Sequence, residues 1–383
     1  MSRDSLTFLV LEFGHTAAKL TLVPAFYRAN DAVNDKVAAI APPVRVKLDL
    51  AAFKESLPQL AGAMLGLLQT HCQQLNAPPL RILLVPGSLS PELAESCLKH
   101  LKAQVLSEKV QHWHLLTREH ALFAAQQCGL TLNYDPQQLG LDRLLNALGV
   151  LASIRDYPGP LSGYGKAYFP NSRRYAVMID AGTAIKMDAL FVKPEGGVDF
   201  IAGAILPGLA QMGTAWQFKP VSASLNRLRN LTAALWPSLF TECFHEKDPE
   251  HHLMNRVSGN FLDYFSFDNS MPVCDTQASL SLGMRSMWQG TIRAAFTNLF
   301  NQVIKRHEAV LLNEQSKANL DFMAQDFKTS ERMPEVWLTG GDAPAVEVAL
   351  TAEAFDSSRK SIKAPALTSV GAVVALQLAD SGD

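Results

Sequence analysis

Two stretches of sequence decide the fold: residues 6–23, LTFLVLEFGHTAAKLTLV, and residues 175–192, YAVMIDAGTAIKMDALFV. Each stretch contains a β-type run, an acidic residue at its end, a turn with glycine and threonine, and a second β-type run. We therefore predict hairpins with strands at 6–13 and 19–23 and at 175–180 and 185–192. The recurrence of this pattern about half a chain apart is a weak internal repeat, and it favours a duplicated α/β architecture.

The segments around these hairpins alternate between helical and strand patterns. Apolar periodicity predicts helices at 52–75, 91–101, 118–128, 140–154, 276–313 and 368–378, and strands at 81–85 and 335–338. A chain of 383 residues exceeds what one hydrophobic core usually serves. We predict a first domain at 1–155, a Gly-, Pro- and Ser-rich linker at 156–173, and a second domain at 174–383 with insertions near 241–273 and 315–332.

Composition excludes several classes of protein. With 48% hydrophobic and 18% charged residues, the chain lacks the signature of disorder. Its formal charge of -2, without a basic block, disfavours nucleic acid as a partner. No apolar run is long enough to span a bilayer and no signal-peptide pattern is present, which predicts no membrane anchor and a cytoplasmic location. Five scattered cysteines without a Cys-x-x-Cys pair predict reduced thiols.

Three glycine-containing turns, each following a predicted strand, are suited to binding phosphate. Glycine lets the backbone approach a ligand, and successive N–H groups with a threonine hydroxyl can face phosphate oxygens. An acidic residue before such a turn can hold Mg²⁺. One such turn is commonplace as structure alone, but three in this order predict a nucleotide site. The turns contain Glu12, Gly14, His15 and Thr16; Asp180, Gly182 and Thr183; and Gly340 and Gly341.

A further candidate is the sequence Gly140-Leu141-Asp142-Arg143 at the start of an apolar helix. A charged pair in this position is often only a helix cap beside a solvated arginine. In a functional interpretation, Asp142 accepts or orients the proton of an attacking hydroxyl, and Arg143 offers its planar fork to a substrate carboxylate. The pattern by itself leaves both interpretations open.

Two other chemistries are disfavoured. The stretch with Cys243, His245, His251 and His252 has no zinc-ligand spacing, so we interpret it as a solvated or interface loop. No Gly-x-x-x-x-Gly-Lys-Ser/Thr sequence is present, which excludes a P-loop kinase.

The order of these motifs resembles the type III pantothenate kinases, part of the superfamily that includes acetate and sugar kinases, actin and heat-shock chaperones. The resemblance rests on residues 12–19, 136–143, 180–188, 203–209, 276–283 and 339–341. It implies an α/β fold of two duplicated ribonuclease H-like (actin-like ATPase) domains around a central cleft. It also implies a homodimer whose pocket is completed by the second subunit.

The resemblance implies a role for each matching position. Asp142 would be the general base, and the ligands of the reaction would be ATP, Mg²⁺ and a monovalent cation, K⁺ or NH₄⁺. Glu12 would hold Mg²⁺ and Asp180 would lie near the monovalent cation. The pantothenate pocket would contain Gly140, Leu141, Arg143, Thr276 and Tyr134, and the ATP site Glu12, Gly14, His15, Thr16, Lys19, Gly182, Thr183, Gly340 and Gly341.

The implied activity is ATP-dependent phosphorylation of pantothenate to 4'-phosphopantothenate, the first step of coenzyme A biosynthesis. Glu12, His15 and Lys186 stand where the family has Asp, Asn and Thr. These departures keep open an alternative, a non-catalytic relative that binds or regulates in the manner of a Bvg accessory factor. A kinase of the same superfamily acting on another small hydroxylated substrate is a further alternative.

Overall fold

The chain is described from a computed structural model. The structure describes residues 7–15, 17–24, 43–47, 53–73, 80–105, 110–133, 135–153, 174–193, 198–208, 211, 276–304, 307, 334–351 and 361–380. The predicted linker at 156–173 and the predicted insertions at 241–273 and 315–332 lie outside these residues, and the predicted domain boundaries stay a prediction.

The first sheet has the strand order β3-β2-β1-β4-β5. Strands β1, β2 and β3 are antiparallel neighbours, whereas β4 and β5 continue the sheet parallel to β1. The first predicted hairpin is therefore the centre of this sheet. The strands are β1 (Thr7–Phe13), β2 (Ala17–Pro24), β3 (Val44–Lys47), β4 (Leu80–Val85) and β5 (Val110–Leu115).

The second sheet repeats this arrangement. Its order is β11-β10-β7-β8-β9-β6, in which β7, β8 and β9 are antiparallel neighbours and β10 and β11 run parallel to β7. Strands β9-β8-β7-β10-β11 thus match β3-β2-β1-β4-β5 in order and direction, which confirms two duplicated ribonuclease H-like sheets. The strands are β6 (Leu130–Leu132), β7 (Arg174–Ala181), β8 (Ala184–Val192), β9 (Val198–Pro207), β10 (Glu335–Gly340) and β11 (Ile362–Lys363).

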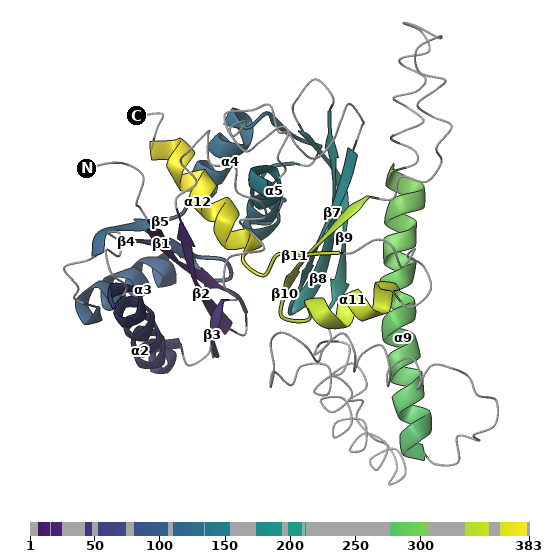
Figure 1. Ribbon diagram of the computed structural model, residues 1–383, viewed down its shortest axis with the longest axis horizontal. Helices are drawn as coiled ribbons and strands as arrows, with labels where there is room; N and C mark the ends of the chain where they lie inside the picture. Colours follow the sequence, from purple (N-terminus) through teal and green to yellow (C-terminus); the bar gives the residue numbers. More distant parts are fainter. Residues whose placement is uncertain are drawn as a thin grey trace, which may run out of the picture.

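Helices cover both sheets and also fill the space between them (Figure 1). Helices α2 (Phe53–Cys72) and α3 (Pro91–Gln104) pack on the outer face of the first sheet. Helices α9 (Thr276–Asn298) and α11 (Ala343–Thr351), with the π-helical turn η4 (Leu299–Ile304), pack on the outer face of the second. Between the sheets, α4 (Arg118–Gln127), α5 (Leu141–Ser153) and α12 (Leu367–Asp380) share one core with the inner faces of both.

The two halves of the chain exchange helices in this central layer. Helix α12, which ends the chain, contacts β1, β2 and β4 of the first sheet, whereas α5 contacts β7 and β8 of the second. The two helices can approach closely because Gly149 and Gly371 lack a Cβ. An added Cβ would meet the Leu367 backbone at Gly149 and the Leu145 backbone at Gly371. The central layer therefore joins the two sheets and fixes the start of α5 against the second one.

Most predicted elements are present, with some differences. The helix predicted at 276–313 is α-helical only to Asn298 and then π-helical to Ile304. Strands β3, β5, β6, β9 and β11 and helix α11 were not predicted from the sequence. Strand β9 contains Gly203 and Pro207, residues that weaken a strand pattern. None of the described helices is long and apolar enough to cross a membrane. Cys97 and Cys128 are buried free thiols, as predicted for reduced cysteines.

Candidate active site

Each of the two hairpins places an acidic residue directly opposite a lysine. In the first hairpin Glu12 pairs with Lys19, and in the second Asp180 pairs with Lys186. Directly opposite residues share one face of an antiparallel pair, so their side chains meet. Lys19 Nζ lies 2.8 Å from Glu12 Oε1, and Lys186 Nζ lies 3.0 Å from Asp180 Oδ2. The internal repeat therefore includes a repeated acid–lysine pair.

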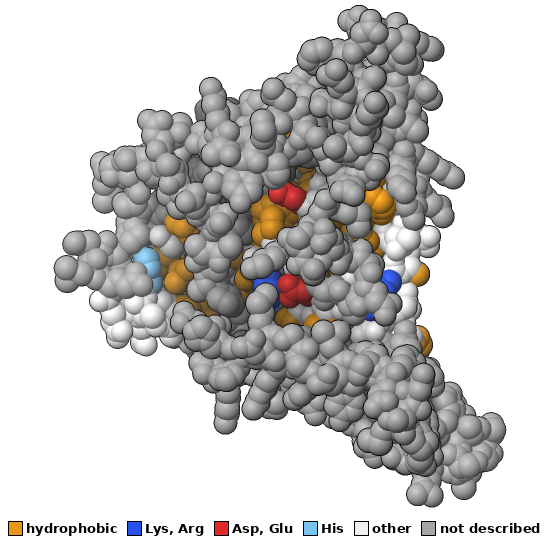
Figure 2. Space-filling view, turned by 45° about the vertical axis from the view of Figure 1, so that its right-hand side comes forward, with side chains coloured by type: hydrophobic (Ala, Val, Ile, Leu, Met, Phe, Trp, Pro, Cys, Tyr) orange, Lys and Arg blue, Asp and Glu red, His pale blue; other side chains and the backbone are white. Residues whose placement is uncertain are grey.

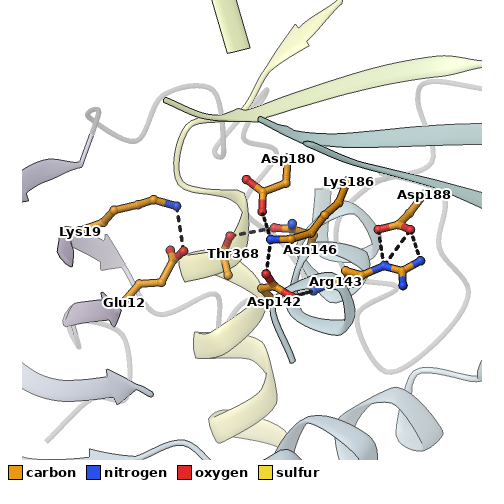
Figure 3. Close-up of polar contacts among 9 residues, drawn as sticks. All are labelled: Glu12, Lys19, Asp142, Arg143, Asn146, Asp180, Lys186, Asp188 and Thr368. Atoms are coloured by element: carbon orange, nitrogen blue, oxygen red, sulfur yellow. Dashed lines mark hydrogen bonds and ion pairs between the residues drawn. The ribbon is translucent and has the colours of Figure 1, made fainter. Parts of the chain in front are cut away.

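Lys186 also binds Asp142, the predicted general base, at the start of α5 (Figure 3). The other oxygen of this carboxylate, Oδ1, accepts a 2.8 Å hydrogen bond from the backbone N–H of Arg143. Gly140 makes room for it, because a Cβ there would lie 2.7 Å from Oδ1. The Asp142 side chain keeps 35% of its surface exposed, so a substrate hydroxyl can reach it.

Arg143 and Asp188 form a second, buried pair between α5 and β8. Arg143 Nε lies 3.0 and 3.1 Å from the two Asp188 oxygens, and Nη2 lies 2.5 Å from Oδ1. Burial raises the pKa of Asp188 to about 6, and the contacts with Arg143 oppose that rise. A Cβ at Gly203 would clash with this pair. The Arg143 guanidinium, which the sequence predicted to meet a substrate carboxylate, thus binds the carboxylate of Asp188 within the protein.

Charges from both sheets converge at this place. Burial disfavours the ionised form of Asp180, but Lys186 and Lys19 together lower its pKa below the ordinary value. Burial likewise disfavours the charged form of Lys19, yet Glu12 and Asp180 raise its pKa overall. Because Lys19 belongs to the first sheet and Asp180 to the second, the two acid–lysine pairs act on each other. Figure 2 shows acidic and basic side chains side by side near the centre of one face of the molecule.

Backbone hydrogen bonds hold the three glycine turns in place. In the first turn Gly14 N–H donates to the Ala17 carbonyl at 2.9 Å. In the second, Gly182 N–H donates to the Ala184 carbonyl at 3.1 Å, and among the described residues no atom outside the turn lies within 4 Å of the position of a Cβ at Gly182. The second turn therefore has an open face beside its backbone, as a phosphate ligand requires.

The third turn is built against the second. Gly340 has a φ of +94°, and a Cβ there would clash with the backbone of Ala181. Asp342 N–H then donates to the Ala181 carbonyl at 2.9 Å. At Gly341 a Cβ would meet the guanidinium of Arg45, which comes from β3 of the first sheet. The third turn thus lies where the two sheets approach each other.

The structure brings together part of the predicted site. It gathers Asp142, Gly140 and Arg143 with Asp180, and places Lys19 beside Glu12. Leu141 is half-buried next to this group, and His15 is exposed at the tip of the first turn. Thr276 begins α9, but its side chain lies outside the described residues, as do Thr16 and Tyr134. The roles of all these residues stay predictions.

Sequence reasoning gave no site role to Lys186, Asp188 and Arg45. For the first two, a signal was available. Pairing the strands of each hairpin across its turn, which is one residue shorter in the second hairpin, puts Lys186 opposite Asp180 as Lys19 is opposite Glu12. Asp188 then follows on the same face of the strand. Arg45 lies in a short strand whose pairing is not evident from local sequence.

The described residues limit which metals fit the site. Within the described part of the chain, no group of three or more His, Cys, Asp or Glu side chains could hold a metal ion. Mg²⁺ in kinases is held by one or two carboxylates together with substrate phosphates, so the single carboxylate of Glu12 fits this use. Each of the two carboxylates already binds one lysine ammonium group: Glu12 binds Lys19, and Asp180 binds Lys186, which also binds Asp142.

Duplicated ribonuclease H-like sheets, with glycine turns and carboxylates where they meet, define the actin-like ATPase fold. Within this fold class, residues 85–219 match the family described as Type III pantothenate kinase. The resemblance predicted from the motifs is thereby confirmed over a segment that contains Asp142, Asp180 and Lys186.

A curated relative supports the same family. The type III pantothenate kinase of Akkermansia muciniphila is 30% identical over 109 residues, which are 28% of this chain and 36% of the relative. The chain thus matches about a third of the length of this relative.

Several solved structures are similar to the chain at low scores. They include the ethanolamine utilization protein EutJ from Carboxydothermus hydrogenoformans, at 9% identity and a TM-score of 0.36, covering 96% of this chain and 88% of that one. Another is MreB5 of Spiroplasma citri bound to AMPPNP, at 11% identity and a TM-score of 0.32, covering 99% and 98%. The strand order of the two sheets defines the fold.

Proposed function

We propose that the protein is a kinase that transfers the γ-phosphoryl group of ATP to pantothenate and forms 4'-phosphopantothenate. The observation that carries the proposal is the position of Asp142. Its accessible carboxylate lies at the start of α5, braced by Lys186 and by the Arg143 N–H, beside a glycine turn with an open face. This supports a base next to a phosphate site, which is what transfer to a hydroxyl requires.

In this proposal Asp142 accepts the proton of the attacking pantothenate hydroxyl. Phosphoryl transfer asks for little covalent chemistry, so the protein contributes positioning and charge stabilisation. Arg143, whose guanidinium is buried and paired with Asp188, would form the inner wall of the pantothenate pocket, and Leu141, Tyr134 and Thr276 would complete that pocket.

On the nucleotide side, the three glycine turns would surround the phosphates of ATP. Lys19 would balance phosphate charge, and Glu12 would hold Mg²⁺, which neutralises phosphate oxygens when bound. His15 and Thr16 would line the first turn, Gly182 and Thr183 the second, and Gly340 and Gly341 the third.

The proposal includes a homodimer, which the family resemblance implies, and a cytoplasmic location, which the sequence patterns predict. Light scattering on the purified chain tests the dimer, because a monomer at the concentration of the activity assay would contradict it.

The test of the function is ATP-dependent phosphorylation of pantothenate, with Mg²⁺, by the purified protein and by Asp142→Asn. Removing a general base typically costs about 10²- to 10⁴-fold in rate. We expect turnover by the wild type, loss of that order in the variant, and similar pantothenate affinity in both. Absence of turnover with pantothenate still bound would overturn the proposal and favour a binding protein, and turnover of a different hydroxylated substrate would identify another kinase.

A further inference from the structure

We propose that the ammonium group of Lys186 takes the place of the monovalent cation beside Asp180, so that the protein carries its own cation and needs neither K⁺ nor NH₄⁺. This inference rests on the proposed function for one point only, that a cation is expected at this carboxylate.

The position of Lys186 is the first argument. Its Nζ binds Asp180 Oδ2 at 3.0 Å and also binds Asp142, so it joins the end of β7 to the start of α5. A monovalent cation at this place would have the same neighbours, because oxygen atoms of carboxylates are the ligands that K⁺ and ammonium both accept. An alkylammonium group is a tethered relative of NH₄⁺ with the same single charge.

Burial and charge are the second argument. Asp180 is only 9% exposed, so its carboxylate needs a partner to remain ionised. Lys186 supplies one, and its own pKa is raised because Asp180 and Asp142 outweigh the burial that would lower it. The ammonium group is therefore charged throughout the physiological range, as a bound alkali cation would be.

The surroundings argue against room for an additional cation. Lys19 and Arg45 also act electrostatically on Asp180, so a free cation there would face three positive groups. A free cation would be repelled by these positive groups, and Asp180 already has the ammonium group of Lys186 as its partner. The residues present therefore do not fit a separate monovalent ion.

The first test measures stability, so that it does not depend on kinase activity. The melting temperature of the full chain, without substrates, is compared in KCl and in tetramethylammonium chloride at equal ionic strength. The variants are Lys186→Thr, which restores the oxygen-bearing residue of the family pattern, and Lys193→Thr as a control. Lys193 lies at the other end of the β7–β8 hairpin, next to β8, and pairs with Asp199 at 2.8 Å.

We expect the melting temperature of the wild type to be the same in the two salts. The melting temperature of Lys193→Thr should likewise not differ between the salts. Lys186→Thr should melt lower in tetramethylammonium and regain stability as K⁺ is added. A wild type that K⁺ stabilises specifically, or a Lys186→Thr variant that is indifferent to K⁺, would overturn the inference.

A second test uses the wild type alone and stands if Lys186→Thr does not fold. Thallium NMR with Tl⁺ as a K⁺ probe should show no bound ion on the full chain, and a bound signal that K⁺ displaces would contradict the inference. Both tests are made without ATP or pantothenate, so a failed phosphorylation assay leaves them valid. If the chain does phosphorylate pantothenate, its kcat should be the same in the two salts.

Discussion

The two hairpins at the centres of the two sheets have the same acid–lysine pair and differ in what the lysine does next. In the first, Lys19 binds Glu12 at 2.8 Å within one sheet. In the second, Lys186 binds Asp180 and also reaches Asp142 on helix α5. The duplication kept the pair of charges, but only the second copy is connected to the residue proposed as the base.

The difference has a structural basis in the central helix layer. Because α5 packs on β7 and β8, two successive residues of the helix, Asp142 and Arg143, face two alternate residues of β8, Lys186 and Asp188. The first sheet receives α12 in the corresponding place. The contacts of α12 with the first hairpin are apolar or between hydroxyls, as in Ser369 with Thr21, and its ion pair with this sheet joins Asp380, at the end of the helix, to Arg81 of β4 at 3.3 Å. The second hairpin is therefore the one suited to position a base.

Breaking the buried pair of the second hairpin should have the largest effect. Asp188→Asn keeps the shape of the side chain but leaves the Arg143 guanidinium, 6% exposed, without its carboxylate. Removing one partner of a buried ion pair typically costs about 3–5 kcal/mol. Urea unfolding at pH 7 measures this loss, with Lys363→Ala as a control.

Lys363 pairs with Glu347 at 3.0 Å but is 65% exposed, so its loss should cost less than about 1 kcal/mol. Equal losses in the two variants would show that the Arg143–Asp188 pair does not hold α5 on β8.

The next effect concerns the room left for the base. Gly140→Ala would push the Asp142 carboxylate, because the new Cβ would lie 2.7 Å from Oδ1. A displacement of about 1 Å can cost about 10²-fold in rate. We expect a fall of that order in kcat for pantothenate phosphorylation with little change in melting temperature, since the end of a flexible side chain can yield.

The matched variant is Gly62→Ala in the exposed part of α2, where the structure describes no contact of the added Cβ within 4 Å beyond its own helix. It should leave kcat unchanged and stabilise the helix by about 0.5–1 kcal/mol. An unchanged kcat in Gly140→Ala would show that the position of the Asp142 carboxylate does not depend on glycine at residue 140.

The sequence was sufficient to predict the two hairpins and the motif residues. It was insufficient to predict which side chains those residues contact in the fold. Alternating and apolar runs predict β1, β2, β7 and β8, because strand periodicity is local. Which helix covers which sheet depends on contacts between residues far apart in the chain, such as Thr368 with Asn146. The sequence therefore predicted Asp142 and Asp180 as separate features, and only the fold shows Lys186 joining them.

The two lysines should differ when each is replaced by methionine. Lys186→Met leaves two carboxylates facing each other, whereas Lys19→Met leaves one. Leaving a buried polar group unsatisfied typically costs about 1–3 kcal/mol, so we expect about 2 kcal/mol for Lys186→Met and about 1 kcal/mol for Lys19→Met at pH 7. Denaturant unfolding of both variants beside the wild type gives the two losses.

The pH dependence of the same variants gives an internal check. The pKa of Asp180 is lowered, so its contribution to stability is present above its ordinary pKa of 3.8 and is lost as the pH falls through the lower folded value. In Lys186→Met, burial without the ammonium group should raise that pKa instead. The stability gap between wild type and variant should therefore narrow as the pH falls from 7 toward 3.8, and a gap that does not change would contradict the pairing.

The smallest effect on stability is expected for alanine in the second glycine turn, and it should differ from the effect of alanine in the first turn. A Cβ at Gly14 would lie 3.1 Å from the Ala17 carbonyl oxygen, whereas a Cβ at Gly182 would have no described residue beyond its chain neighbours within 4 Å. Gly182→Ala should change stability by less than about 0.5 kcal/mol, and Gly14→Ala should cost more, because its neighbour is backbone. If phosphate approaches the open face of the second turn, Gly182→Ala should still weaken binding of Mg²⁺ with a non-hydrolysable ATP analogue. Calorimetric titration measures that affinity, and an unchanged value at unchanged stability would place the phosphates away from Gly182.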